Sequence, residues 1–316
     1  MTRIVKIIPY NPDWPLIFSK EAGLIKKILG DNCLCIHHIG STSVPDLPAK
    51  PIIDMIPVVK DIMVVDQMAS AMEQHGYQAK GENGMLFRRF FQKTENGNAY
   101  NIHIYEEGNP EIERHVKFRD WMRTHENDRK AYAKLKIELA EKYPNDLLSY
   151  VFGKETFVAD IDTKAGANGL RIVQALTNRE WETIRNFRQK YFFDPASTLD
   201  PYTWTFEHKD HIHLVLYKGH TIIGYAHIQL WPNHRAALRI IVIDESYRGE
   251  GFGSQFLKLC ERWLLQQGMK TIHTQSSPNA FQFYNVRGYI QMPFNDPDGY
   301  ETDPRDIEMG KVLQRL

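Results

Sequence analysis

Three glycines at alternate positions, Gly249, Gly251 and Gly253, precede a segment with the apolar spacing of a helix. Residues without a Cβ let neighbouring backbone N–H groups turn inward together, and the first N–H groups of a helix lack partners of their own. A corner of this kind can bind phosphate. The dinucleotide fingerprint would need a glycine at Phe256, and no Gly-Lys-Ser/Thr follows as in a Walker loop. The glycines alone therefore fit a plain turn as well as a phosphate-binding loop.

A second dense group of polar residues lies in HHIGSTSVPDLPAKPIIDM, residues 37–55, between two apolar segments. A Gly-Ser turn after a strand can offer amides and a hydroxyl to a triphosphate, and an acidic residue on the next strand can bind Mg²⁺. Two-metal transfer normally uses Asp-x-Asp, but Asp54 is followed by Met55 and Ile56. Mg²⁺ could therefore bind only through Asp54, which argues against active nucleotidyl transfer.

The residue types in and near this motif suit a phosphate or carboxylate ligand. The candidate ligand-binding residues are His38, Ser41, Thr42, Lys50, Asp54, Arg88, Arg89, His103 and Arg119. In a purely structural interpretation, Lys50 and Asp54 would form an ion pair and the Gly-Ser turn would merely end a strand. Both interpretations stay open from the residues alone.

Composition excludes several classes of protein. The chain has 316 residues, with 39 Lys and Arg against 39 Asp and Glu, so no net charge draws it toward nucleic acid or an anionic membrane. No stretch approaches the roughly 18 apolar residues of a membrane span, and the first residues lack the apolar core of a signal peptide. The cysteines, Cys33, Cys35 and Cys260, are odd in number and lack a CxxC spacing, which argues against disulfides and structural zinc. We expect a soluble, cytoplasmic protein without nucleic-acid or membrane partners.

The segment DTKAGANG, residues 162–169, interrupts periodic sequence with small and polar residues, and the chain length fits two domains. The first half is expected to mix α and β structure. Its predicted elements are strands at 4–10, 33–40, 51–59, 85–92 and 99–105, a helix that starts at residues 12–15, and helical sequence at 112–160.

The second half begins with a predicted strand at 170–176 and a helix opened by a capping box of Thr177 and Glu180. A long hairpin over 211–231 turns at 218–220. The further expected elements are a strand at 237–244, a helix at 254–267 that buries Phe256, Leu257, Cys260, Trp263 and Leu264, a strand at 270–275, a helix at 279–288, and strands at 289–294 and 306–313.

This order of elements resembles the GNAT family of acyl-CoA-dependent N-acetyltransferases, together with YRGEGFG at 247–253, NAFQFYNVRGY at 279–289 and MGKVL at 309–313. The resemblance implies a central mixed, splayed β-sheet flanked by helices. It also implies that loop amides hold the pyrophosphate of acetyl-CoA while the preceding strand and an asparagine contact the pantetheine. The implied acetyl-CoA-binding residues are Ile241, Val242, Ile243, Arg248, Gly249, Glu250, Gly251, Phe252, Gly253 and Asn279. Tyr284 takes the position of the family's general acid, which protonates the departing thiolate.

The acceptor side departs from the family pattern. Many relatives carry a base glutamate on the strand before the loop, whereas AALRIIV at 236–242 contains no carboxylate and places Arg239 there. Glu207 and His227 are substitutes by chain position only, so the base stays unassigned. An acidic loop could attract a cationic amine or simply face water. Its acidic residues are Asp296, Asp298, Glu301, Asp303 and Asp306.

The first half resembles the GrpB family, also called UPF0157, which is related to the nucleotidyltransferase superfamily. The resemblance rests on the motif at 37–55, on NIHIY at 101–105 and on FRDWMRTHENDRKAYAKLK at 118–136. It implies a nucleotidyltransferase-like domain with a mixed sheet and helices over residues 1–162, a linker over 163–169 and the GNAT domain over 170–316. In such a domain, His103 stands where a third acidic residue would be expected.

We therefore expect an acetyl-CoA-dependent N-acetyltransferase that acts on a primary amine of a small molecule or peptide. The GrpB-like half would bind a nucleotide or another anionic ligand, with Mg²⁺ only if Asp54 holds it. Two alternatives follow from the missing glutamate and the incomplete Asp-x-Asp. The protein could bind or sense acyl-CoA or a nucleotide without turnover, or the first half could transfer nucleotidyl groups.

Overall fold

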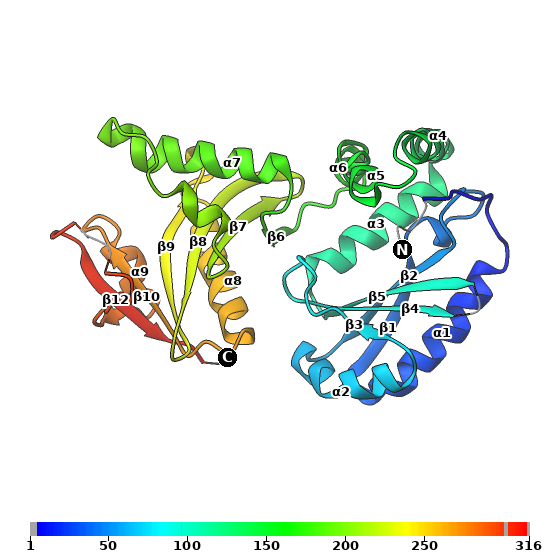
Figure 1. Cartoon of the computed structure of the whole chain (residues 1–316), viewed down its shortest axis with the longest axis horizontal. Helices are drawn as coiled ribbons and strands as arrows, with labels where there is room; N and C mark the ends of the chain where they lie inside the picture. The colour runs from blue at the N-terminus through cyan, green and yellow to red at the C-terminus, as the bar shows by residue number, and fades with distance from the viewer. Residues whose placement is uncertain (1–4, 96, 300–302, 315–316) are drawn as a thin grey trace. The chain divides into compact units, whose positions relative to one another are not determined.

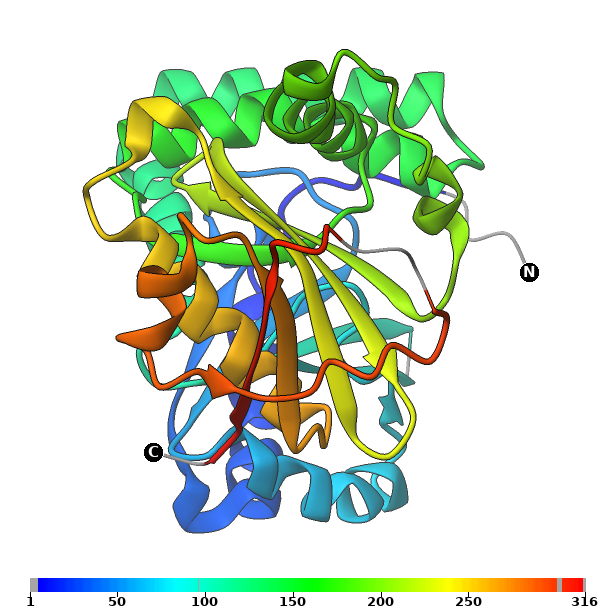
Figure 2. The same cartoon turned by 90° about the vertical axis from the view of Figure 1, so that its left-hand side faces the viewer.

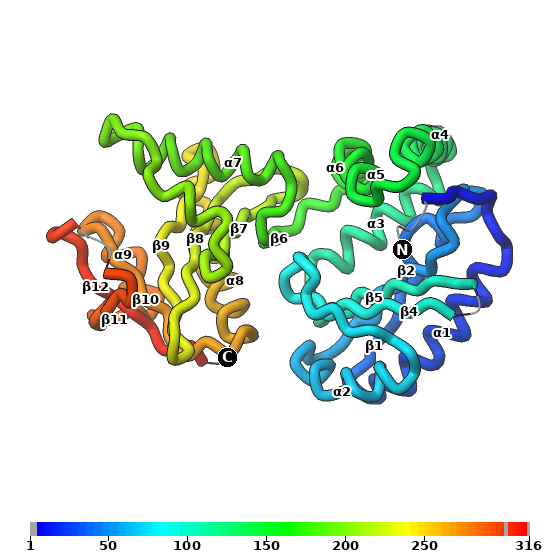
Figure 3. The backbone as a smooth tube through the Cα atoms, in the orientation of Figure 1, coloured from blue at the N-terminus to red at the C-terminus, as the bar shows by residue number. Residues whose placement is uncertain are grey.

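The computed structural model describes residues 5–95, 97–299 and 303–314, so Ile4 and Glu301 of the sequence predictions lie outside the described residues. The chain separates into two compact units, Met1–Arg171 with Lys218–His220, and Ile172–Tyr217 with Thr221–Leu316. Each unit contains one mixed sheet with helices (Figures 1 and 3), which confirms the predicted fold class. The domain limits 1–162 and 170–316 stay a prediction.

A five-stranded sheet in the order β1-β2-β5-β4-β3 forms the centre of the first unit. β1 and β2 are antiparallel, β2 and β5 are parallel, and β4 is antiparallel to β5 and β3. The strands are β1 Cys33–Ile39, β2 Ile52–Val59, β3 Gln78–Ala79, β4 Arg88–Glu95 and β5 Asn98–Glu106. The apolar residues of β2 lie on both of its faces because this strand is internal to the sheet.

Helices pack on both faces of this sheet (Figure 1). On one face, α1 (Trp14–Leu29) and α2 (Ile62–Gln74) enclose the main apolar core. On the other face, α3 (Pro110–Thr124) contributes Ile112. Three more helices follow α3 along the chain: α4 Glu126–Lys142, α5 Leu147–Phe152 and α6 Glu155–Lys164. Residues 37–55 contact both sides: Ala49, Ile53 and Met55 belong to the main core, whereas Val44 and Leu47 pack with residues of α3, α4 and α6.

One sequence prediction for the first unit was wrong. The expected strand at 4–10 forms only one isolated bridge, between Ile8 and Ala49, because Val5 and Ile7 pack against Tyr150 instead of pairing in the sheet. The predicted helical sequence at 112–160 is confirmed and forms α3 to α6, with Pro144 and Gly153 at the breaks that follow α4 and α5. Tyr132 of α4 and Ile161 of α6 pack with Val44 and Leu47, which lie between β1 and β2.

A seven-stranded sheet in the order β11-β12-β10-β9-β8-β7-β6 forms the second unit (Figure 2). The strands are β6 Leu170–Gln174, β7 His211–Lys218, β8 Thr221–Trp231, β9 Arg235–Ile243, β10 Thr271–Ser276, β11 Ile290–Gln291 and β12 Ile307–Val312. β9 runs antiparallel to β8 and parallel to β10. The parallel pairing covers only residues 271–273 against 235–237, so β9 and β10 separate beyond Ala237. This separation confirms the splayed sheet that the sequence implied.

Three helices accompany the second sheet. The first, α7 (Asn178–Arg188), begins with the predicted capping box of Thr177 and Glu180. The second, α8 (Phe252–Gln266), buries the apolar face predicted for it and begins inside the glycine loop. The third, α9 (Phe281–Asn285), is shorter than the predicted helix at 279–288. Among the described residues, no helix combines the length and the apolar character needed to cross a membrane.

Candidate functional site

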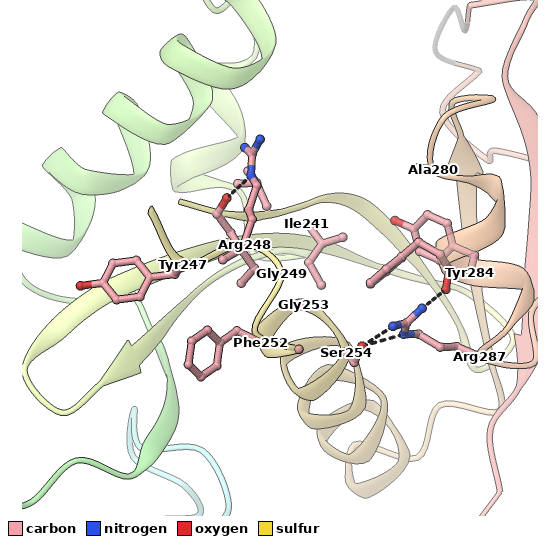
Figure 4. Close-up of a pocket in the computed structure, with 14 residues that line it drawn as sticks. Ile241, Tyr247, Arg248, Gly249, Phe252, Gly253, Ser254, Ala280, Tyr284 and Arg287 are labelled. Carbon is pink, nitrogen blue, oxygen red and sulfur yellow. Dashed lines mark hydrogen bonds between the residues drawn. The ribbon is translucent and has the colours of Figure 1, made fainter. Parts of the chain in front are cut away.

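A pocket of about 530 Å³ lies where β9 and β10 separate, between the start of α8 and the α9 segment (Figure 4). Its lining residues are Ile241, Val242, Ile243, Tyr247, Arg248, Gly249, Gly251, Phe252, Gly253, Ser254, Ala280, Phe283, Tyr284 and Arg287. Most of the predicted acetyl-CoA-binding residues are therefore brought together at one pocket. Glu250 and Asn279 are exposed and do not line it, so their binding roles stay predictions.

The glycine loop has a backbone that requires glycine at two positions. Gly249 and Gly251 both have φ of +84°, a left-handed conformation that L-residues with side chains rarely adopt. Gly251 is the N-cap of α8, so the first N–H groups of that helix open beside the loop. The Nε atom of Arg248 donates to the backbone oxygen of Ile243 at 2.9 Å, which ties the loop to the end of β9 (Figure 4). Backbone donors thus meet at one end of the pocket, as an anion-binding corner requires.

Tyr284 lies on α9 and lines a different part of the pocket from the glycine loop. Only 6% of its surface is exposed, and its ring packs against those of Phe283 and Tyr289. Burial raises the pKa of the Tyr284 phenol to about 12, with a hydrogen bond to Thr274 opposing that effect. The phenol therefore keeps its proton at neutral pH, which is the state a proton donor needs.

Sequence reasoning missed a cationic side chain at this pocket, Arg287. Its Nε donates to Oγ of Ser254 at 3.0 Å, a further guanidinium nitrogen donates to the backbone oxygen of Phe283, and the group lies 4.0 Å over the ring of Phe283 (Figure 4). These contacts hold a permanent positive charge beside the first turn of α8. The signal was present, because Arg287 lies four residues after Phe283 inside the quoted motif and so falls on the same face of a helix.

The two residues considered as substitutes for the base do not line the pocket. Glu207 is exposed at the end of a short 3₁₀ turn. His227 is buried in β8, where its Nε2 lies 2.8 Å from Nδ1 of His211 and its ring stacks on His213. Burial, reinforced by neighbouring cations, holds the pKa of His227 well below its usual value. His227 is therefore neutral and a weak base.

The acidic loop folds partly onto the sheet. Asp296, whose side chain is 8% exposed, lies 2.7 Å from Nη2 of Arg239, and Asp298 accepts from Nε2 of Gln229 at 2.5 Å. Gln229 also accepts from Arg239 through Oε1. The interpretation of a loop that only faces water does not hold for Asp296. Asp303 does face solvent and pairs with Arg305.

In the first unit, the Gly-Ser turn and Asp54 lie in contact. A Cβ on Gly40 would lie 2.7 Å from Oδ2 of Asp54. The other carboxylate oxygen accepts from Nδ2 of Asn101 at 2.8 Å and lies 3.7 Å from Nε2 of His103. Arg88 extends this group, since its Nη1 is 3.1 Å from Nδ1 of His103.

Other candidates of the first unit have different surroundings. Arg89 pairs with Asp66 of α2 at 2.5 Å, on the sheet face opposite to His103, so the structure does not bring it to Asp54. The ring of His38 stacks on Phe18 of α1 and bonds to Thr42 Oγ1 at 3.1 Å.

The remaining candidates have side chains that are already engaged by other groups of the first unit. Thr42 donates to the backbone oxygen of Ile52, and Arg119 donates to Asp120 and to the backbone oxygen of His38. Ser41 accepts from Nζ of Lys136, and Lys50 lies over the ring of Tyr150. Lys136 and Lys154, which lies near Asp54, were missed because lysines on polar-faced helices normally point to solvent.

The surroundings of Asp54 do not fit a Mg²⁺ site. Its carboxylate contacts the amide of Asn101 and faces the ring of His103, whereas Mg²⁺ prefers several oxygen ligands. Within the described ranges, no group of three or more His, Cys, Asp or Glu side chains could hold a metal ion.

Comparisons with known proteins agree with both resemblances. Residues 4–164 match the family model of the GrpB protein, and residues 181–289 match that of the acetyltransferase (GNAT) family. The UPF0157 protein YqkA of Bacillus subtilis is 45% identical over 163 residues, which are 52% of this chain and 48% of YqkA, so the chain spans about half the length of that relative. A UPF0157 protein of Halalkalibacterium halodurans is 35% identical over 164 residues, covering 52% of this chain and 83% of that protein.

A solved structure is also similar to the first half. The crystal structure of the conserved protein GrpB from Enterococcus faecalis is 38% identical, covers 51% of this chain and 96% of its own, and superposes with a TM-score of 0.49. Because the GrpB family model matches residues 4–164, about half of the chain, the chain belongs to the GrpB family, and it continues into a segment, residues 181–289, that matches the GNAT acetyltransferase family.

Proposed function

We propose that the second unit binds acetyl-CoA and transfers its acetyl group to a primary amine of a small molecule or peptide. One observation carries this proposal. All residues that line the pocket of about 530 Å³ lie between positions 241 and 287, inside the segment that matches the acetyltransferase family. The cavity thus coincides with the part of the chain for which the family predicts an acyl-CoA site.

The loop end of the pocket suits a diphosphate. Backbone N–H groups at residues 248–253 lie where the two left-handed glycines turn the chain into α8. The helix N-terminus carries partial positive charge, and Arg287 adds a full charge beside Ser254 in the first turn. Together these donors would hold the anionic end of acetyl-CoA and aim its other end along β9.

The β9 end of the pocket suits the reacting group. Acetyl-CoA, when bound, supplies a thioester whose acetyl group an amine can attack. Tyr284, which keeps its phenolic proton at neutral pH, could donate that proton to the thiolate as it leaves. The main chain at residues 241–243 is paired with β8 on one side but lies beyond the part of β9 that pairs with β10, so its groups on the β10 side could bond the ligand.

The acceptor would react as a free amine. Of the candidate bases, Glu207 does not line the pocket, and burial keeps His227 neutral with a pKa too low to take a proton from an alkylammonium ion. We infer that the amine loses its proton to water before the attack. The rate of transfer should then rise with pH toward the pKa of the acceptor amine itself.

The same absence of a base among the pocket-lining residues favours a second candidate function, the binding or sensing of acyl-CoA without turnover. Isothermal titration calorimetry with acetyl-CoA on the full chain tests the site that both candidates share. An assay of free CoA thiol, run with pooled small amines, polyamines, aminoglycosides and peptides, then separates them. Thiol release with one pool supports transfer, and tight binding with no release from any pool supports sensing. A chain that does not bind acetyl-CoA would overturn both.

A further inference from the structure

Three lysines from separate segments of the first unit come together beside the Gly-Ser turn. Lys50 lies in the loop before β2, Lys136 lies in α4, and Lys154 is the N-cap of α6. The Nζ atoms of Lys50 and Lys154 lie 4.9 Å and 4.6 Å from the centroid of the same ring, that of Tyr150. We call Lys50, Lys136 and Lys154 the three-lysine site.

Lys136 connects this site to the Gly-Ser turn. Its Nζ donates to Oγ of Ser41 at 2.9 Å and to the backbone oxygen of Pro48, and it lies 4.8 Å from the centroid of the Tyr132 ring. Only 2% of Lys136 is exposed. A buried ammonium group is normally paired with a carboxylate, but the partners of Lys136 are a hydroxyl, a carbonyl and an aromatic ring, all of them uncharged.

The lysines repel one another. Burial, and then the charges of Lys154 and Lys50, lower the pKa of Lys136 to about 7. Burial and Lys50 lower the pKa of Lys154 to about 8, and only Asp54 acts in the opposite direction. The charges that act on Lys136 and Lys154 are thus those of the other lysines and, for Lys154, the carboxylate of Asp54, which is itself engaged by Asn101. An anion bound among the three amines would remove this repulsion.

We propose that Lys50, Lys136 and Lys154 bind a phosphate-bearing ligand directly, with their ammonium groups in place of a divalent cation. Phosphate esters carry the multiple negative charge and the acceptor oxygens that three ammonium groups would satisfy. The Ser41 hydroxyl, which accepts from Lys136, has its own O–H to add as a neutral donor at the same place. The site lies wholly within the first unit and is independent of the proposed acetyl transfer.

The test measures binding of tripolyphosphate to the full chain in the presence of EDTA, by calorimetry and by the rise in melting temperature. The wild-type chain should bind and gain stability without any metal, and Lys154→Met and Lys50→Met should each lower the affinity about tenfold or more. The matched control is Lys142→Met, because Nζ of Lys142 also lies over a tyrosine ring, 5.1 Å from the centroid of Tyr143, but outside the site. That variant should bind as the wild type does.

A second control separates tripolyphosphate binding at the three-lysine site from binding at the pocket of the second unit. Gly251→Val, which alters the glycine loop, removes binding of tripolyphosphate at that loop and should leave the part of the binding in EDTA that Lys50→Met and Lys154→Met weaken. The readout is the difference between ligand-free and ligand-bound protein, so a variant that is merely less stable does not imitate the result. The proposal is overturned if the wild-type chain does not bind, if binding needs Mg²⁺, or if Lys154→Met and Lys50→Met bind as tightly as Lys142→Met.

Discussion

A Cβ on Gly40 would lie 2.7 Å from Oδ2 of Asp54, a distance that side chains do not tolerate. Gly40 also has φ of +69°. The turn after β1 therefore approaches the carboxylate of β2 so closely that only glycine fits, and the next residue, Ser41, accepts from Lys136 through its hydroxyl.

Replacing Gly40 should destabilise the protein by more than the strain of its left-handed backbone alone would. Gly40→Ala adds a clash with Asp54 to the strain of a left-handed residue, so we expect a loss of about 2–4 kcal/mol in the free energy of unfolding. Gly81→Ala is the control, because Gly81 has φ of +58° with nothing within 4 Å of its Cβ position. Urea unfolding of both variants measures the difference. Equal losses would show that the approach to Asp54 is not restrictive.

The glycine loop of the second unit can be tested with a pair of variants that share the same strain. Gly251 and Gly268 have φ of +84° and +80°, and a Cβ on either would meet nothing within 4 Å. Gly251 lies at the start of α8 and lines the pocket, whereas Gly268 lies just beyond the end of that helix. Valine at either position should cost about 1–3 kcal/mol of stability.

Only Gly251→Val should weaken acetyl-CoA binding, by about tenfold or more, because it moves the loop amides. Calorimetry on the two variants, with the wild type as reference, decides the point. A similar loss of affinity in Gly268→Val would mean that binding follows overall stability, and full affinity in Gly251→Val would remove the loop from the site.

Tyr284 should affect turnover rather than coenzyme binding. Tyr284→Phe keeps the ring against Phe283 and Tyr289 and removes only the hydroxyl, so acetyl-CoA affinity should stay within about twofold while kcat falls about 100-fold. Because burial raises the pKa of this phenol to about 12, the wild-type enzyme should show no loss of activity from Tyr284 ionisation below that pH. Steady-state kinetics with an acceptor found in the amine screen provides the measurement. An unchanged kcat would exclude the phenol as proton donor.

Features that depend on residues close together in the sequence could be predicted, whereas contacts between segments far apart in the sequence could not. The Gly-Ser turn and Asp54 were predictable because they end and begin consecutive strands, and the pocket loop because its glycines directly precede α8. The positions of Lys136 and Lys154 could not be predicted, since each belongs to a separate polar-faced helix. Nothing in the local sequence shows that Lys136 contacts Ser41 or that Lys154 lies over the ring of Tyr150. The opposite placement of Arg88 and Arg89 follows from strand alternation, but which face receives Asp66 depends on how α2 packs.

At the three-lysine site, the affinity for tripolyphosphate should fall as the pH rises, although the ligand itself becomes more negative. Tripolyphosphate becomes more negative as the pH rises, which by itself would strengthen binding to cations. The pKa values of Lys136 and Lys154, lowered to about 7 and about 8, mean that both amines lose their protons over the same range. Affinity should therefore fall roughly tenfold or more between about pH 6.5 and pH 9.

The stability of the ligand-free protein should change in the other direction. Because the pKa of each lysine is lower in the folded than in the unfolded chain, the unfolded state binds more protons between about pH 7 and pH 10, and stability from these groups rises with pH over that window. Lys136→Met should flatten both trends, whereas Lys142→Met should leave them unchanged. Calorimetric affinities and urea midpoints across this range provide the two measurements. An affinity that stays constant or rises with pH would show that the lysines do not carry the binding.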